Sequence, residues 1–231
     1  MPVISFEGAA VSYDGEEVLR PVTLELSERR IGIIGSNGSG KSTLVRLING
    51  LIEPTAGRML YDGLDPASQG KYVRRRVGFV FSDAETQIVM PLVADDVAFS
   101  LRRFRLPRAE VRTRVETMLT RYGLADKADN SPHTLSGGEK QLLALAAVAV
   151  IEPDTIIADE PTTLLDLRNR RRIIRELAAL DQQVIVVTHD LDMLRGFDRV
   201  LCLDNGSLVY DGTAEGAIEH YLRLMDGEPE P

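Results

Sequence analysis

The stretch GIIGSNGSGKST, residues 32–43, contains the pattern G-x-x-x-x-G-K-S between an apolar run and the amphipathic run KSTLVRLINGL. Its glycines let successive backbone N–H groups turn inward, and the helix that follows adds the positive end of its dipole. The pattern therefore predicts a loop that binds the phosphates of a nucleotide. The residues expected to contact them are Ser36, Asn37, Gly38, Ser39, Gly40, Lys41, Ser42 and Thr43. Lys41 is expected to reach the β- and γ-phosphates, and Ser42 to ligand Mg²⁺.

The rest of the chain predicts an α/β fold around this loop. Strand-like runs with tight turns fill the first third, and strands alternate with helices again after residue 152, which indicates a mainly parallel sheet. The segment between them is mostly helical in pattern. We therefore expect a nucleotide-binding α/β core, residues 1–82 and 152–231, interrupted by a helical subdomain, residues 83–151. The tail GEPEP is expected to be disordered.

Two further strand ends carry polar side chains suited to nucleotide hydrolysis. Asp159 and Glu160 end the apolar run DTIIADE, and His189 ends QVIVVTH. Beside a phosphate-binding loop, Asp159 would hold Mg²⁺ through water and Glu160 would polarise the attacking water. His189 would contact the γ-phosphate or hold Glu160 and the water in place, because the carboxyl end of a parallel strand lies at the ligand edge of such a sheet. The alternative for these residues is capping of the helices that follow.

A second predicted anion-binding helix start lies in TLSGGEKQLLALAAVAV, where Ser136, Gly137, Gly138 and Glu139 precede or begin a long apolar helix. Two such starts on opposite subdomains suggest a head-to-tail dimer. Each nucleotide would then lie between the loop at residues 35–43 of one subunit and Ser136 to Gly138 of the other.

The charge and hydropathy of the chain limit the classes of partner and the location that we expect. The chain has 27 basic and 35 acidic residues and a net charge of −8, which argues against nucleic acid as the main partner. We see no run of about 18 apolar residues that would span a bilayer and no signal-peptide pattern, so we expect a cytoplasmic protein.

These motifs, in this order and over nearly the whole chain, resemble the nucleotide-binding subunits of ATP-binding cassette (ABC) transporters. Residues 35–43 match the Walker A loop of that family, residues 156–160 its Walker B strand, residues 135–141 its signature and His189 its switch histidine. The resemblance implies a P-loop ATPase fold with an N-terminal antiparallel β region, ATP and Mg²⁺ as ligands, and hydrolysis that depends on Lys41, Glu160 and His189. It also implies that Tyr13 stacks on adenine and that Asp166 belongs to the dimer-contacting D-loop.

A finer resemblance is to the energy-coupling-factor (ECF) importers. TQIVMPLVADDVAFS is similar to the segment after their Q-loop, and ERRIGIIGSNGSGKSTLVRLINGL looks most like their biotin-importer ATPase subunit. This implies a motor on the cytoplasmic face of the membrane, paired with a second ATPase copy, a transmembrane coupling subunit and a membrane-embedded substrate-binding subunit. Biotin is the expected cargo, with cobalt, nickel or another vitamin as the alternative.

The chain departs from the family at the Q-loop. Where the family places a metal-binding glutamine after this strand, VGFVFSDAETQ has Ser82. Ser82 would act through a bridging water, or Gln87 would fold back as a substitute, or the site tolerates the loss. We favour the water, because five residues of displacement normally place Gln87 on the partner-facing loop.

The segment after this strand is expected to form the groove for a coupling helix of the membrane partner, with Ile88, Val89, Asp95, Asp96 and Phe99 in it. Asp95 and Asp96 would suit basic side chains on that partner. The alternative is that both acids complement the dipole of a helix N-terminus.

Other classes of ABC protein fit less well. A DNA-repair ATPase needs long coiled coils and a translation factor usually has two cassettes, and neither pattern is present. A catalytically dead regulatory subunit conflicts with the presence of Lys41, Asp159, Glu160 and His189. A non-transport soluble ABC ATPase stays as the alternative function.

Overall fold

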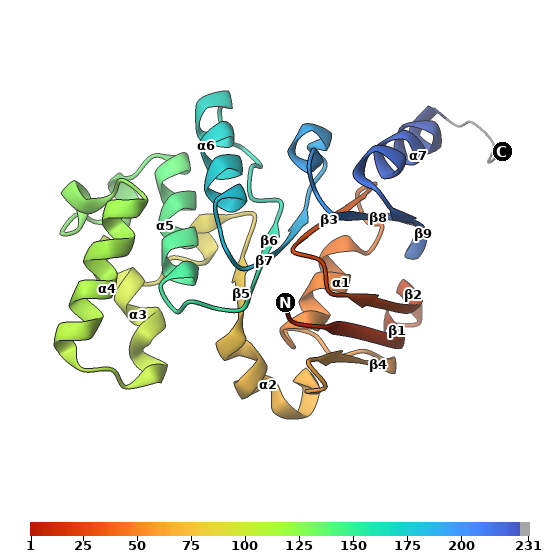
Figure 1. Ribbon diagram of the computed structural model, residues 1–231, viewed down its shortest axis with the longest axis horizontal. Coiled ribbons are helices and arrows are strands. Elements are labelled where there is room, and N and C mark those ends of the chain that lie inside the picture. Colours follow the sequence, from red (N-terminus) through yellow and green to blue (C-terminus); the bar gives the residue numbers. More distant parts are fainter. Residues whose placement is uncertain (227–231) are drawn as a thin grey trace.

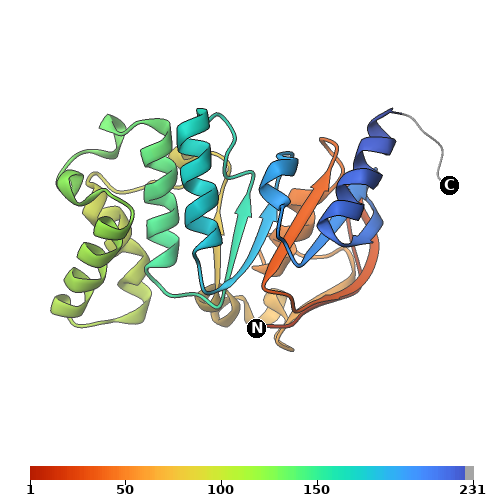
Figure 2. The same ribbon diagram turned by 45° about the horizontal axis from the view of Figure 1, so that its top comes forward.

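Two sheets organise residues 1–226, the part of the chain that the computed structural model describes (Figures 1 and 2). The expected disorder of the tail GEPEP concerns residues outside this part. The smaller sheet is antiparallel and has the order β2 (Glu16–Leu26), β1 (Ile4–Tyr13), β4 (Ala56–Tyr61). The larger sheet has the order β5 (Val77–Val80), β6 (Thr155–Asp159), β7 (Gln183–Val187), β3 (Arg30–Gly35), β8 (Arg199–Asp204), β9 (Ser207–Gly212). Its first five strands are parallel, so the predicted α/β class with an antiparallel N-terminal region is confirmed.

Helix α1 (Lys41–Ile48) packs between the two sheets. Its buried residues Leu44, Leu47 and Ile48 share one core with Phe6 of the small sheet and Ile33 of the large sheet. Burial of each such side chain contributes about 1.5–3 kcal/mol, so the helix that begins at the glycine-rich loop is held from both sides.

All the secondary-structure elements between Ala84 and Ala149 are helices. The α-helices are α3 (Val93–Leu101), α4 (Arg108–Arg121) and α5 (Gly137–Ala149), and short 3-10 turns connect them. Helix α5 is buried nearly all round, because it packs against α3, α4, β5 and also α6 (Leu167–Ala178). Its run of Leu and Ala combines high helix propensity with a surface that neighbouring helices can approach closely.

Three features were not predicted from the sequence. β1 continues through Gly8 as one strand, because Gly8 adopts a left-handed conformation (φ 59°) that shifts the register without reversing the chain. Helix α2 (Pro66–Arg76) begins after the cap Asp65 and was not predicted, since it carries few apolar residues. Helix α7 (Ala214–Asp226) was also not predicted, and it covers β8 and β9.

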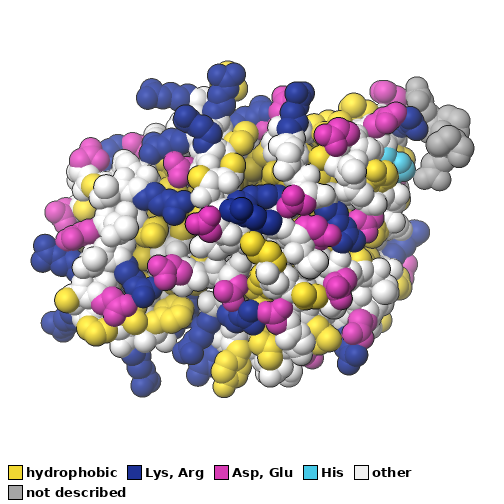
Figure 3. Space-filling view, in the orientation of Figure 1, with side chains coloured by type: hydrophobic (Ala, Val, Ile, Leu, Met, Phe, Trp, Pro, Cys, Tyr) yellow, Lys and Arg dark blue, Asp and Glu magenta, His cyan; other side chains and the backbone are white. Residues whose placement is uncertain are grey.

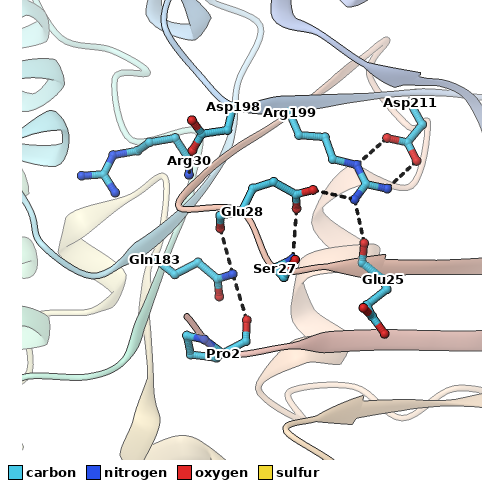
Figure 4. Close-up of polar contacts among 9 residues, drawn as sticks. All are labelled: Pro2, Glu25, Ser27, Glu28, Arg30, Gln183, Asp198, Arg199 and Asp211. Atoms are coloured by element: carbon cyan, nitrogen blue, oxygen red, sulfur yellow. Dashed lines mark hydrogen bonds and ion pairs between the residues drawn. The ribbon is translucent and has the colours of Figure 1, made fainter.

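At the edge where the parallel strands begin, long polar side chains join the two sheets (Figure 4). Gln183 donates to the carbonyls of Pro2 and Glu28 at 3.2 and 3.0 Å, and Arg199 contacts Asp211, Glu28 and the Glu25 carbonyl. The Asp211 and Glu28 carboxylates raise the pKa of Arg199, which keeps this link charged. The opposite edge, where the parallel strands end, carries the glycine-rich loop.

No helix within the described residues combines the length and the apolar character that crossing a membrane requires.

Candidate nucleotide site

The glycine-rich loop connects β3 to α1 through three glycines with positive φ. Gly35 has φ 145°, and a Cβ added there would lie 2.0 Å from the Leu203 carbonyl oxygen. Gly38 and Gly40 have φ 80° and 94°, values that L side chains rarely adopt. Other residues at these positions would strain the loop, and at Gly35 they would also clash with the Leu203 carbonyl.

Inside the loop lie donors suited to phosphate oxygens. The Lys41 ammonium donates to the carbonyls of Gly35 and Ser36 at 2.9 and 2.7 Å, which leaves its third N–H for another acceptor. The Ser39 hydroxyl is buried and has no hydrogen-bond partner within residues 1–226. Burial lowers the pKa of the Lys41 ammonium, while the charges of Glu160 and Asp159 oppose that shift. This arrangement suits an anionic ligand that satisfies both groups.

The hydroxyl and carboxylate expected at the metal lie together. Ser42 Oγ donates to Asp159 Oδ1 at 2.9 Å, and Arg46 Nη2 lies 3.6 Å from Asp159 Oδ2. Asp159 is buried at the end of β6, where its main chain pairs with Val187. Hard oxygen donors of this kind are the ligands that Mg²⁺ prefers, so the residues fit the ion. The Arg46 contact was not predicted, because Arg46 follows the motif by four residues on α1.

Glu160 and His189 form a contact at the same edge. Glu160 Oε2 lies 2.7 Å from His189 Nδ1, and because a carboxylate only accepts, Nδ1 carries the shared proton. The Glu160 backbone is left-handed (φ 53°), an uncommon conformation for glutamate, and its N–H donates to the Val187 carbonyl at 2.9 Å. Glu160 directly follows the last residue of β6, with its carboxylate held beside His189.

Tyr13, the residue expected to stack on adenine, is the last residue of β1 and is 51% exposed. A tyrosine ring exposed to this extent at a strand end offers a face for stacking.

The second anion-binding start, Ser136 to Glu139, is a capping box at the start of α5. Glu139 accepts from the Ser136 N–H at 2.9 Å, Ser136 Oγ accepts from the Glu139 N–H, and Lys127 pairs with the same carboxylate. The Lys127 hydrogen bond, with those from Ser136, lowers the pKa of Glu139 to about 2. At Gly138 a Cβ would lie 2.2 Å from Asn169 of α6, so this glycine is also required for packing.

Asp166, the residue expected in the D-loop, caps α6. Its carboxylate accepts from the Asn169 N–H at 2.8 Å and from the Asn169 side chain at 3.0 Å. Next to it, Arg170 pairs with Asp190, the residue after His189. This ion pair was not predicted, because its partners are separated by a helix and a strand.

The two candidates for the Q-loop ligand differ in their surroundings. Ser82 is exposed just beyond β5, and its hydroxyl has no hydrogen bond within the described part of the chain. Gln87 folds back onto β5, where its carboxamide accepts from the Phe81 N–H at 3.1 Å and donates to the Phe79 carbonyl at 3.2 Å. Gln141, which is buried near the start of α5, donates to the Phe81 carbonyl at 3.2 Å. Both glutamines therefore bind the open edge of β5.

The expected coupling groove contains a pocket of about 270 Å³. Its lining residues are Glu85, Lys140, Pro132, His133 and the segment 88–91, which includes Ile88 and Val89. Asp95 and Phe99 are exposed on α3.

Asp96 differs from the expectation that it meets a basic partner side chain. Its carboxylate is buried and accepts from the N–H groups of Val89 and Met90 at 2.9 and 3.0 Å. Burial raises the pKa of Asp96, and these two hydrogen bonds oppose the shift. Both acids lie in the first turn of α3, which agrees with the alternative that they complement its dipole.

We expect Asp96→Asn to preserve stability, because an amide oxygen accepts the same two bonds without a buried charge. Asp96→Ala leaves two N–H groups unpaired and should lower the free energy of unfolding by about 1–3 kcal/mol. Denaturant unfolding measures both changes, and Asp95→Ala, an exposed neighbour, is the control. Equal losses for the asparagine and alanine variants would contradict this role.

The fold and the glycine-rich loop define a P-loop ATPase, in which Lys41, Asp159, Glu160 and His189 lie at one sheet edge. Residues 19–163 match the model of the ABC transporter family. The biotin transport ATP-binding protein BioM of Rhizobium etli is 47% identical over 221 residues, covering 96% of this chain and 98% of that protein. The energy-coupling factor transporter ATP-binding protein EcfA of Methanosarcina acetivorans is 37% identical, covering 94% and 81%.

Among solved structures, cbiO1 of Clostridium perfringens, part of the ABC transporter complex cbiONQ, superimposes with a TM-score of 0.82 at 31% identity. The superposition covers 96% of this chain and 94% of that one. The chain belongs to the ABC transporter family, as an ECF-type ATP-binding subunit, and it is an ATPase whose hydrolysis is coupled to transport.

Proposed function

We propose that this chain is the motor of an ECF-type biotin importer, acting on the cytoplasmic face of the membrane with a transmembrane coupling subunit and a membrane-embedded substrate-binding subunit. The observation that carries the proposal is 47% identity to a biotin transport ATP-binding protein over 96% of the chain. The assembly of Lys41, Asp159, Glu160 and His189 at one edge supports an active motor over a regulatory subunit.

The two proposed parts of the chain, the nucleotide-binding core and the helical subdomain, correspond to different regions of the fold. Residues 1–82 and 152–231 would form the nucleotide-binding core, and residues 83–151 the helical subdomain. Helix α1 packs against β2, β3, β4, β6 and β7, whereas α5 packs against α3, α4, α6 and β5, and the two helices stand apart in both ribbon views (Figures 1 and 2). This separation supports a head-to-tail homodimer in which Ser136 to Gly138 and Asp166 of one copy complete the site of the other.

Within that site, the loop N–H groups and Lys41 would bind the phosphates, and Tyr13 would stack on adenine. Ser42 and Asp159 would hold Mg²⁺, which supplies positive charge to the β- and γ-phosphates when bound. Glu160 would accept a proton from the attacking water. The water oxygen would bond to the γ-phosphorus while the bond between that phosphorus and the β–γ bridging oxygen breaks. ADP and phosphate leave. His189 would hold Glu160 in place through the contact at 2.7 Å.

For the metal, we propose that Ser82 acts through a bridging water and that Gln87 instead hydrogen-bonds the main chain along β5. Ser82→Ala should raise the Mg²⁺ concentration needed for half-maximal ATPase activity about two- to tenfold, the effect of one hydrogen bond. Gln87→Ala should leave that concentration unchanged, because its carboxamide already binds the main chain of β5. The reverse pattern would favour Gln87 as the substitute ligand.

The partner would dock a helix at the groove formed by Ile88, Val89, Asp95 and Phe99. Val89 and Phe99 are 62% and 44% exposed, which supports an apolar contact there, and Asp95 supplies an exposed negative charge.

The test is a pull-down of the tagged chain from detergent-solubilised native membranes, with mass spectrometry of the retained proteins and small molecules. Two small integral membrane proteins and bound biotin are the expected result. Recovery of another vitamin, cobalt or nickel would change the proposed cargo and leave the proposed motor function unchanged. Soluble partners alone would favour a non-transport ABC ATPase.

A further inference from the structure

A basic pocket of about 700 Å³ lies between α2 and the turn that connects α3 to α4. Its lining consists of one aromatic ring and five cationic side chains, Phe104 with Lys71, Arg75, Arg102, Arg103 and Arg105. Figure 3 shows lysine and arginine side chains gathered along the lower margin of the molecule, beneath α3 and beside α2. None of these residues has a role in the nucleotide site.

The positive charge of this pocket is not neutralised by the described part of the chain. Across residues 1–226, none of the five cations lies within ion-pair distance of a carboxylate, and neither does Arg74, which precedes Arg75. Arg76, the next residue of α2, pairs with Asp62 and Asp154 instead. In a chain of net charge −8, a group of cations without acidic partners is a specific feature of this surface.

The two walls of the pocket are joined by their own guanidinium groups. Arg103 donates to the Arg74 carbonyl at 2.9 Å and Arg75 to the Arg103 carbonyl at 3.3 Å. The guanidinium carbons of Arg75 and Arg103 lie 5.8 and 5.5 Å from the centre of the Phe104 ring. Burial lowers the pKa of Arg103, and the charges of Arg75 and Arg74 lower it further. Each of these two guanidiniums uses one of its five N–H donors on the main chain, and the others are left for a ligand.

We propose that this pocket binds a phosphate-bearing anion, held by Arg75 and Arg103 and attracted by Lys71, Arg102 and Arg105 at the rim. Guanidinium groups in fixed positions match phosphate oxygens two at a time, and a phosphate supplies the negative charge that the pocket lacks.

The phosphate has two candidate sources, an anionic lipid headgroup or a soluble polyphosphate. Arg102 also lies 5.0 Å from the centre of the Phe99 ring, so the pocket adjoins the proposed coupling groove. The lipid source rests on the membrane association proposed above, whereas the phosphate chemistry of the pocket does not.

The test uses a triple variant, Lys71→Gln, Arg102→Gln and Arg105→Asn. It removes three exposed charges and keeps the guanidiniums that join the walls. Asparagine suits position 105, which is left-handed (φ 53°). The matched control removes three exposed arginines elsewhere, through Arg20→Gln, Arg112→Gln and Arg223→Gln. All proteins are saturated with Mg·ADP so that the glycine-rich loop is occupied. Two probes follow: flotation with phosphatidylcholine vesicles with and without phosphatidylglycerol, and calorimetric titration with inorganic pyrophosphate.

The triple variant should bind the anionic probe at least about tenfold more weakly than the wild type and the control, since each cation near an anionic surface contributes about 1 kcal/mol, or fivefold. Loss of vesicle binding would identify a lipid headgroup, and loss of pyrophosphate binding alone a soluble phosphate. An equal loss in the control, or no binding of either probe by the wild type, would overturn the proposal. ATPase activity of the triple variant should equal that of the wild type, so failure here is distinguishable from failure of the motor function.

Discussion

Replacing Glu160 by glutamine is expected to lower the rate of ATP hydrolysis by about a hundredfold or more while ATP still binds. Glutamine has nearly the shape of glutamate, so the bond from its N–H to the Val187 carbonyl and the contact with His189 can both persist. It cannot accept a proton from water. Single-turnover hydrolysis measures the loss, and size-exclusion chromatography with ATP should show a trapped dimer.

A matched control exists in the same chain. Glu152 is also a glutamate with a left-handed backbone (φ 51°), and it lies away from the nucleotide edge beside Arg114. Glu152→Gln should leave turnover unchanged, which excludes a general effect of the substitution on a strained glutamate. Retained hydrolysis in Glu160→Gln would remove Glu160 as the general base.

Replacing Lys41 by alanine is expected to weaken ATP binding by about ten- to a hundredfold. A hydrogen bond to a charged group contributes about 1.5–3 kcal/mol, and the ammonium is the charged donor at the centre of the loop. Calorimetric titration with ATP measures the dissociation constant. Arg112→Ala is the control, because Arg112 is an exposed cation on α4, outside both the loop and the basic pocket.

The loss of ATP affinity in Lys41→Ala must be distinguished from a change in the shape of the loop, because Lys41 also binds the Gly35 and Ser36 carbonyls. A thermal unfolding midpoint close to that of the wild type, together with weaker ATP binding, would assign the effect to the phosphate contact. Unchanged ATP affinity would contradict the assignment.

Much of the site was predictable because it is local. Gly35 to Ser42 lie in one stretch, and their backbone conformations depend on residue type at each position. Asp159 and His189 follow apolar runs, and parallel strands end at the same edge of the sheet, so their proximity to the loop could be inferred. The strain at Glu160 could not, because nothing in the residue type favours a positive φ.

Elements with weak patterns escaped prediction. Helix α2 is mostly polar, and only three of its residues are buried, so it has no apolar stripe to mark it. Within β1, Gly8 permits either a turn or a bulge, and the pairing with β2 and β4 selects the bulge.

The sequence by itself determined the fold class, the phosphate-binding loop and the order of the polar strand ends, because each depends on local periodicity and residue type. Only the tertiary structure decided where Gln87 and Asp96 bind and that the cations of α2 and the α3–α4 turn share one pocket. The reason is physical. A carboxylate or carboxamide near a helix start can meet main-chain donors, a metal or a partner, and only packing of distant segments determines which of them lies within hydrogen-bond distance.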